Sequence, residues 1–429
     1  MKLAVALLLN LGLLVTLGWW LRREYRRAGP VLRRWLLPAL VLRVVAGTFQ
    51  HSSDAYFLHA WGQGFTAQFW MRPAAGGLAL WQGHQVWYGP HTWSVYRWSN
   101  ALFVSKILAL LNFVTLGSFW LAGVYLSLGC YVACWGLVRT LRQLWPAAPV
   151  GAGVLAFLLW PSVVWWSAGI TKETLVLGSG AALVAMLLNS LYYRLPAAGW
   201  QQLGWWGLLL GLGWLQVRLR YFFALPLLGS LLALVGVVRA ERRGWLPAGW
   251  RAQGLGLLAG VALAGPLVVA AGGEPVSKAF VTSQLWGNYL HGVATSAGRP
   301  HLEYPGLQPT LGSMASHFPV AAAQTLVRPW LGESAGLRYV GVGLENLLLL
   351  GLLVLATTAV VRGRPGRLPA ALVLTLLLYC VVLAGLIGLS TPNLGTLLRY
   401  RTVLLPWLLW LLLQNDYARR LLRRLGLGD

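Results

Sequence analysis

The chain has 429 residues, of which 58% are hydrophobic and only 10% are charged. Soluble globular proteins carry roughly 25% charged residues, so this composition excludes a soluble enzyme or binding module. It predicts an all-α polytopic membrane protein. The net charge of +24 does not indicate a nucleic-acid partner, because most arginines stand in short clusters between apolar stretches. In such places positive charge sets membrane topology and meets anionic lipid.

The alternation of apolar stretches and arginine clusters predicts the topology. Residues 3–20 lack a small-residue cleavage site and are interpreted as a span, not a signal peptide. The basic cluster at residues 22–34 follows, and the positive-inside rule places it in the cytoplasm. Continued along the chain, this reasoning gives about 11 transmembrane helices, with the N-terminus outside and the C-terminus inside. They lie near residues 3–20, 35–48, 114–135, 150–166, 176–193, 203–217, 221–238, 255–271, 340–361 and 368–389, with a short last span after Arg401.

Two long segments, residues 50–100 and 272–339, are predicted to be outer loops. They hold all seven histidines and several of the acidic residues, so we expect any chemistry on the outer face. Residues 101–111 are amphipathic and predict a helix in the membrane interface. We therefore expect one transmembrane domain over residues 1–429, in which the two outer loops form a substrate groove. The chain shows no internal repeat, which disfavours an inverted-repeat transporter.

Lys172 and Glu173 stand side by side between two apolar runs, in the stretch WPSVVWWSAGITKETL at residues 160–175. So short a polar connection between two spans predicts a helical hairpin. Ionisable groups at such a rim are costly unless satisfied, which makes both residues candidates for substrate binding. The alternative is that both side chains extend to lipid headgroups.

Asp54 is the best candidate for a catalytic group, and His59 lies close by in QHSSDAYFLHAWG. A carboxylate at the membrane boundary can act as general base toward a sugar hydroxyl, or hold a divalent metal against a phosphate leaving group. The alternative is that Asp54 caps a helix that begins at Ala55. A histidine-based zinc site is disfavoured because no HExxH motif is present.

Several basic residues lie where the positive-inside rule disfavours them, and we predict that they converge on one rim. The guanidinium group offers a planar set of donors that matches phosphate oxygens. The alternative for each residue alone is contact with lipid headgroups. Asn393 stands in the outer turn before Arg399 and Arg401 and joins the predicted substrate-binding set. That set is Lys172, Glu173, Arg218, Arg220, Arg328, Asn393, Arg399 and Arg401.

Three further features complete the expectations. Glu345 stands inside an apolar span, and we expect a structural ion pair with Arg328 or Arg338. The cysteines Cys130, Cys134 and Cys380 have neither zinc-binding nor redox spacing. We predict no protein metal site and no definite cofactor, and leave open a divalent metal, Mg²⁺ or Mn²⁺.

The parts together resemble the membrane glycosyltransferases of the GT-C superfamily. The resemblance rests on an early outer aspartate, long outer loops, many spans and an arginine near the last one. The segments PSVVWWSAGITKE, RPW, GLEN and NLGTLLRYR are similar to segments of bacterial envelope proteins. The chain departs from the superfamily pattern in two respects. Asp54 follows the second predicted span, whereas the superfamily aspartate usually follows the first. No clear DxD pair is present.

This resemblance implies an enzyme that moves a sugar from a polyprenyl-phosphate-linked donor to a glycan, lipid or protein acceptor. It would act on the outer face of a bacterial inner membrane, among membrane lipids and without nucleic acid. One alternative is a polysaccharide polymerase of O-antigen type, or a ligase, that uses undecaprenyl-pyrophosphate substrates and paired arginines. A further alternative is a non-enzymatic transporter or assembly subunit.

Overall fold

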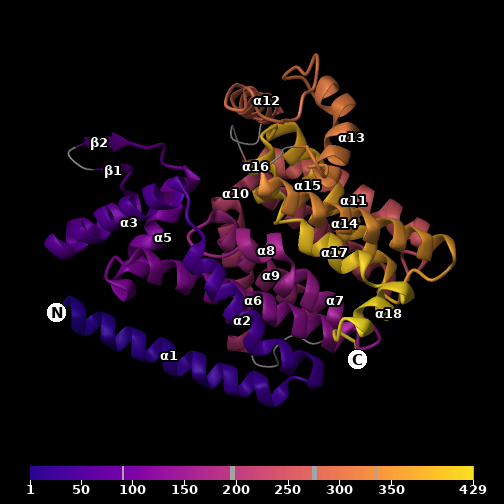
Figure 1. The fold of residues 1–429 in the computed structure, drawn as a ribbon, viewed down its shortest axis with the longest axis horizontal. Coiled ribbons are helices and arrows are strands. Elements are labelled where there is room, and N and C mark those ends of the chain that lie inside the picture. The colour runs from indigo at the N-terminus through magenta and orange to yellow at the C-terminus, as the bar shows by residue number, and fades with distance from the viewer. Residues whose placement is uncertain (89–90, 194–198, 273–277, 334–335, 429) are drawn as a thin grey trace. The chain divides into compact units, whose positions relative to one another are not determined.

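The structure is a computed structural model that describes residues 1–88, 91–193, 199–272, 278–333 and 336–428. Part of the predicted outer loop 272–339 lies outside these residues. The described chain is helical apart from one antiparallel hairpin (Figure 1). The prediction of an all-α protein of membrane type is therefore confirmed at this coarse level.

The chain divides into two compact units, each built from discontinuous segments. Unit 1 comprises Met1–Arg139, Val164–Ala185 and Leu203–Tyr221, and unit 2 comprises Thr140–Val163, Met186–Gln202 and Phe222–Asp429. Unit 1 contains α1 (Lys2–Arg27), α2 (Pro30–Phe49), α3 (Ser53–Met71), α4 (Pro73–Gln82), β1 (Gln85–Tyr88), β2 (His91–Ser94) and α5 (Asn100–Thr115), with parts of α6 (Phe119–Leu144), α8 (Pro161–Trp166), α9 (Lys172–Tyr192) and α10 (Gly199–Arg242). Unit 2 contains the remaining parts of these helices with α7 (Val150–Val154), the π-helix η1 (Leu155–Leu159), α11 (Trp250–Gly272), α12 (Lys278–Ala294), α13 (Leu311–Val327), α14 (Leu337–Val361), α15 (Ala370–Ser390), α16 (Leu394–Arg401), α17 (Leu405–Leu412) and α18 (Asp416–Arg424).

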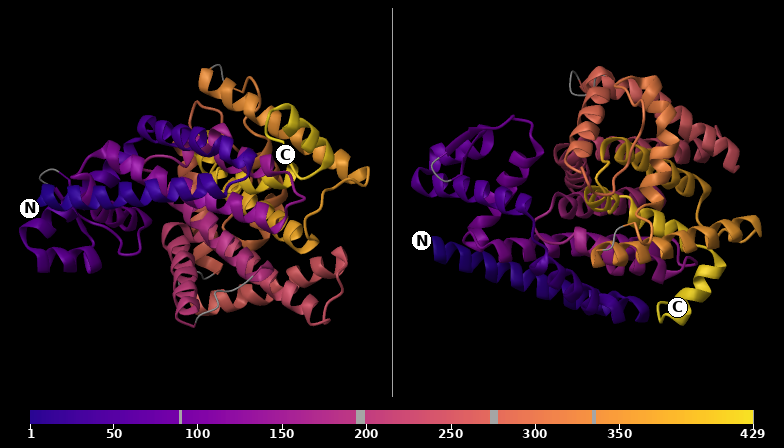
Figure 2. Two further views of the ribbon diagram at one scale, coloured as in Figure 1. Left: turned by 90° about the horizontal axis from the view of Figure 1, so that it is seen from below. Right: turned by 45° about the horizontal axis from the view of Figure 1, so that its top comes forward.

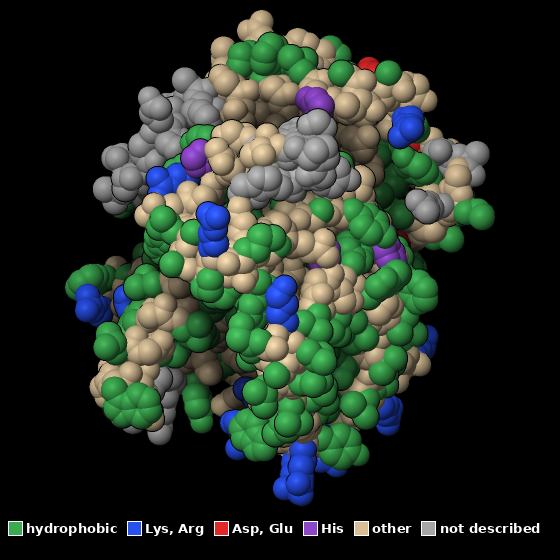
Figure 3. Space-filling view, turned by 90° about the vertical axis from the view of Figure 1, so that its left-hand side faces the viewer, with side chains coloured by type: hydrophobic (Ala, Val, Ile, Leu, Met, Phe, Trp, Pro, Cys, Tyr) green, Lys and Arg blue, Asp and Glu red, His purple; other side chains and the backbone are tan. Residues whose placement is uncertain are grey.

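Six helices of the described chain are long and apolar enough to cross a membrane: α1, α6, α9, α10, α14 from Tyr339 onward, and α15. α1 runs without a break (Figure 2), and its side chains are largely exposed, as for Leu8 at 71%. Hydrophobic side chains also cover broad areas of the face drawn in Figure 3, where the visible charged groups are mostly Lys and Arg. Such exposed apolar surface is expected of helices that meet lipid.

The prediction of about 11 spans is not met by these criteria, and the reasons are local. The predicted spans 203–217 and 221–238 both lie in α10, which is interrupted at Arg220 by extended backbone (φ −158°, ψ 89°). The predicted span 150–166 is divided into α7, η1 and α8, with Pro161 at the start of α8. α17 has only 8 residues, and α2 carries three arginines.

Within unit 1, small residues let backbones approach closely. Gly47 of α2 lies against α6, where a Cβ would overlap Ser127 Oγ. Ser127 Oγ accepts a hydrogen bond of 2.8 Å from Gly169 N, in the connection between α8 and α9. Gly169 has a φ of +70°, a conformation that favours glycine. This contact of α2, α6 and the α8–α9 connection fixes where α9 begins.

The predicted outer loop 50–100 is mostly helical. α3 begins after its N-cap Ser52 and packs along α5 (Figure 1). The two helices are joined by Thr66, whose hydroxyl donates to Ala109 O at 2.9 Å, and by the buried ring of Phe65. α3 and α5 therefore form a fixed platform that carries the candidate residues of unit 1.

Within unit 2, α13 and α15 pack against each other (Figure 1). Their crossing depends on Gly385 and Gly388, where a Cβ would overlap Phe318 and the Ala321 carbonyl. Thr325 Oγ1 donates to Ala384 O across the same contact at 2.9 Å. Small residues with an interhelical hydrogen bond are the usual means by which helices associate in lipid.

Candidate functional site

A buried arginine of α2 holds the connection between α8 and α9. Arg43 of α2 is fully buried, and its Nη1 donates to Ser167 O at 2.9 Å and to Ser167 Oγ. Thr174 Oγ1 donates to Gly169 O at 3.1 Å, within the first turn of α9. The connection is thus built around a buried charged group that satisfies the buried carbonyl of Ser167.

This connection places Lys172 and Glu173 at the start of α9 with different partners. Lys172 Nζ donates to Asn100 Oδ1 at 2.8 Å, at the first residue of α5. Glu173 is 1% exposed and forms an ion pair with Arg220 Nη2 at 2.6 Å. The pair satisfies a carboxylate that would otherwise be buried at high cost. Lys172 therefore faces the α5 end, whereas Glu173 secures α10.

Arg218 lies near the same end of α5. Its guanidinium stacks over the rings of Trp98 and Phe103, with Cζ 4.7 Å and 5.0 Å from the two ring centroids. Lys106, one turn along α5, has a pKa that is lowered by burial and further by Arg218 and Arg97. These groups are therefore close enough to repel one another. We call Lys106, Lys172, Arg218, Trp98 and Phe103 the cation–aromatic cluster.

Asp54 is exposed in the first turn of α3, where a carboxylate is favoured by the helix dipole. The helix cap is Ser52, whose Oγ accepts from Ala55 N at 3.2 Å, so the alternative of a capping Asp54 is wrong. The backbone of Gln50 passes against Gly169: a Cβ there would lie 3.3 Å from Gln50 O. The segments that lead into Asp54 and Lys172 thus meet in unit 1.

His59, the other predicted catalytic residue, is 5% exposed on α3. Its ring packs edge-on against Phe119, with centroids 5.4 Å apart, and burial lowers its pKa. A buried neutral imidazole in aromatic packing has a structural role here. Its catalytic assignment stays a prediction that this geometry does not favour.

In unit 2, Arg401 is 1% exposed and bonds chiefly to main-chain oxygens. Its Nη1 lies 2.9 Å from Asn346 Oδ1, 3.1 Å from Arg328 O and 3.4 Å from Thr325 O. Asn346 Nδ2 in turn donates to Val327 O. Arg401 therefore satisfies the carbonyl groups at the C-terminal end of α13, as cations commonly do.

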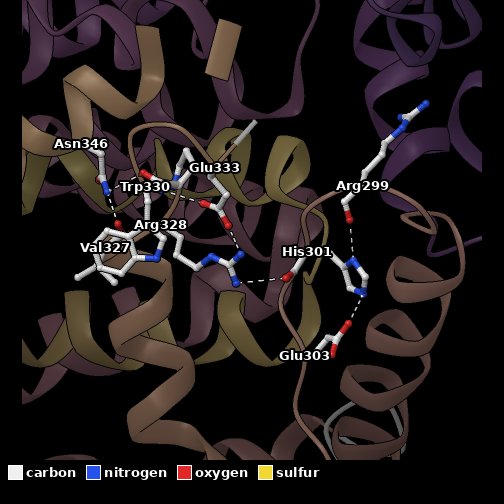
Figure 4. A network of polar contacts seen from close by, with 9 residues as sticks. Arg299, His301, Glu303, Val327, Arg328, Trp330, Glu333 and Asn346 are labelled. Atoms are coloured by element: carbon white, nitrogen blue, oxygen red, sulfur yellow. Dashed lines mark hydrogen bonds and ion pairs between the residues drawn. The ribbon is translucent and has the colours of Figure 1, made fainter. Parts of the chain in front are cut away.

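Arg328 belongs to the adjoining network drawn in Figure 4. Its Nη2 pairs with Glu333, and its Nη1 donates to His301 O at 3.1 Å. Glu333 Oε2 also accepts from Trp330 N at 2.8 Å, and His301 Nε2 lies 3.1 Å from Glu303. Arg328 is thus committed to holding two segments of unit 2 together.

Asn393 lies near this network, and Arg399 follows it on α16. Asn393 caps α16 by accepting from Thr396 N at 3.0 Å, and its amide donates to Ser296 Oγ at 2.9 Å. Asn393 also pairs with His301 through an isolated antiparallel bridge. The Arg399 guanidinium lies 5.3 Å from the ring centroid of Tyr400. The substrate-binding residues predicted from the sequence thus form two groups, one in each unit, and their union in one basin stays a prediction.

The expected ion pair of Glu345 with Arg328 is wrong, because Arg328 pairs with Glu333. Glu345 instead accepts a hydrogen bond from Ser162 Oγ. The alternative partner, Arg338, has a side chain outside the described residues. Because Ser162 carries no charge, a search of the sequence for an oppositely charged partner of Glu345 could not identify it.

Three residues that lie beside the predicted site residues of unit 1 were not predicted from the sequence: Arg43, Asn100 and Lys106. Arg43 was the signal most open to detection, since a lone arginine within an apolar span needs a buried partner. Asn100 and Lys106 carry no such signal, because their role depends on how α5 meets α9 and α10.

The described residues hold no group of three His, Cys, Asp or Glu side chains that could bind a metal ion. A role for Mg²⁺ or Mn²⁺ therefore stays a prediction. The three cysteines are buried and free.

Comparisons of this chain with protein-family models, with curated proteins and with solved structures found no match.

Proposed function

We propose that this protein is a membrane glycosyltransferase that takes a sugar from a polyprenyl-phosphate-linked donor. It would act on the outer face of a bacterial inner membrane. The proposal includes the GT-C-like arrangement with about 11 spans, in which both halves of α10 and shorter helices such as α2 and α17 also cross.

The observation that carries the proposal is the cation–aromatic cluster of unit 1. The start of α9 and the middle of α10 bring Lys172 and Arg218 to the first turn of α5, beside exposed aromatic rings such as Trp98 at 63%, and Lys106 lies further along α5. Cations that repel one another beside apolar rings are stabilised by an anion with an apolar tail. A phosphorylated lipid has this chemistry.

The distribution of acids supports Asp54 as the base. Unit 1 has three acidic residues, Glu24, Asp54 and Glu173. Glu24 is buried and bonds to Trp135 Nε1 at 3.0 Å and Arg139 Nη1 at 2.5 Å, and Glu173 pairs with Arg220. Asp54 is the exposed member of the three.

In the proposed reaction, Asp54 accepts the proton of an acceptor hydroxyl as its oxygen attacks the anomeric carbon of the donor. The bond from that carbon to the phosphate oxygen breaks, and the lipid phosphate leaves with the electron pair. Lys172 and Arg218 stabilise the charge that develops on this phosphate. The aromatic rings of the cluster hold the first part of the lipid chain.

The second candidate, a polymerase or ligase using undecaprenyl pyrophosphate, receives less support. It requires paired arginines, but one member of each predicted pair is already bonded. Arg220 is held by Glu173, and Arg401 by main-chain carbonyls and Asn346.

The test uses the full chain in lipid nanodiscs, with a panel of radiolabelled polyprenyl-monophosphate hexoses and membrane-extracted acceptors. Asp54→Asn is expected to lower the transfer rate about 10²–10⁴-fold, the usual contribution of a general base. Asp416→Asn is the matched control, since Asp416 is also exposed in the first turn of a helix.

Full transfer by a folded Asp54→Asn variant would contradict the assigned base. Activity on pyrophosphate donors alone, with dependence on the arginines and not on Asp54, would favour the polymerase. Lipid-linked sugar movement without a new glycosidic bond would contradict an enzyme altogether.

A further inference from the structure

A cavity lies in unit 1, between the end of α3, α4 and the start of β1. Its volume is about 710 Å³, within the range of roughly 300–1,000 Å³ that is typical of small-molecule sites. The cavity exists because α4 folds back tightly on α3: a Cβ at Gly76 would overlap the backbone of Phe69. The turn at Arg72–Pro73 joins the two helices.

The chemistry of the lining is unusual for an apolar chain. Its polar side chains are Gln68, Arg72, Gln82, His84 and Gln85, and its apolar ones include Met71 and Leu78. None of the described residues that line it carries a carboxylate, which disfavours a cation. The described residues of the lining include no Tyr, Trp or Phe.

Among the described residues, one polar atom of the lining is an unsatisfied hydrogen-bond acceptor. The side-chain oxygen of Gln68 is buried and has no hydrogen-bond partner among the described residues. A buried acceptor of this kind is normally satisfied by a donor such as a hydroxyl group. Each glutamine amide presents a donor and an acceptor together, which matches adjacent hydroxyl groups on a sugar ring.

We propose that this cavity binds a saccharide that carries a carboxylate, of the uronic acid type. The three glutamines bond to its hydroxyl groups, and Met71 and Leu78 contact the C–H face of a ring. Arg72 binds the carboxylate through paired N–H groups, assisted by His84. As the acceptor subsite of the transferase, the cavity rests on the proposed function, whereas saccharide binding itself does not.

The test measures binding of two probes, cellobiose and cellobiouronic acid, to the full chain in nanodiscs without any donor. Gln82→Leu is expected to weaken both probes about fivefold, the effect of one lost hydrogen bond. Arg72→Gln is expected to weaken cellobiouronic acid about tenfold and cellobiose little. The matched control is Gln201→Leu, an exposed glutamine on α10.

Binding of neither disaccharide would overturn the inference, as would equal affinities in wild type, Gln82→Leu and Arg72→Gln. Gln82 is exposed, so its substitution leaves the helix packing in place. Binding that depends on Gln82 and Arg72 in a protein that transfers no sugar would support this site while the proposed function fails. Sugar transfer at the wild-type rate in both variants would support the proposed function and contradict the cavity as its acceptor subsite.

Discussion

At the scale of single residues, the buried acidic groups that the structure describes in unit 1 each have a partner. Glu24 bonds to Trp135 and Arg139, and Glu173 pairs with Arg220. Such pairs are poor evidence of added stability, because desolvation offsets much of their attraction. Their significance is that Glu24, Glu173 and Arg220 serve the scaffold of unit 1.

The Glu173–Arg220 pair gives the first stability prediction. Glu173→Gln should destabilise the protein by about 3 kcal/mol, because the mostly buried guanidinium of Arg220 loses its carboxylate. The free energy of unfolding is measured by chemical denaturation in detergent micelles. Glu173→Gln combined with Arg220→Gln should recover part of the loss, since no charge is then buried alone. A double variant less stable than the single one would show that the pair does not act in this way.

At the scale of elements, the α8–α9 connection decides where the predicted site stands. The sequence predicts a helical hairpin here from its short polar connection between apolar runs; the structure has α9 as one long apolar helix, whereas the run before it is divided into α7, η1 and α8. The sequence could not show that Arg43, far away on α2, would hold the connection through Ser167. That contact requires the close packing of α2 on α6 at Gly47, which depends on tertiary structure.

Arg43 is therefore predicted to be a positioning residue. Arg43→Met should leave the carbonyl of Ser167 without its donor and loosen the connection, at a cost of about 1–3 kcal/mol. The direct measurement is hydrogen exchange of the peptide spanning residues 164–174, which should become faster in the variant. Arg43→Lys, which keeps a donor, should restore part of the protection. Unchanged exchange in Arg43→Met would rule out this role.

Other elements show where prediction from sequence ended. The apolar stretches indicated helices correctly. A backbone in lipid finds no water to bond, so an apolar segment must form its hydrogen bonds internally, as a helix does. The number of spans was predicted less well: α10 contains two predicted spans, and its interruption lies at Arg220, the residue that pairs with Glu173. The cap of α3 at Ser52, in place of Asp54, was not foreseen.

At the scale of the whole molecule, Arg218 differs in its surroundings from Arg328 and Arg401. In unit 2, Arg328 and Arg401 bond to a carboxylate and to main-chain carbonyls, which makes them part of the scaffold. In unit 1, Arg218 lies on aromatic rings beside other cations. The positive-inside rule marked all of them as exceptions but could not separate these roles, because it counts charges and not their partners.

The central claim is that the cation–aromatic cluster binds a phosphorylated lipid, and native mass spectrometry of protein purified from membranes tests it most directly. We predict that wild type retains a polyprenyl monophosphate and that Lys172→Gln with Arg218→Gln reduces this retention at least about tenfold, since each cation contributes charge-assisted hydrogen bonds. The control is Arg22→Gln with Arg26→Gln, two exposed arginines of α1. Equal retention of the lipid by all three proteins, or none by wild type, would contradict the account.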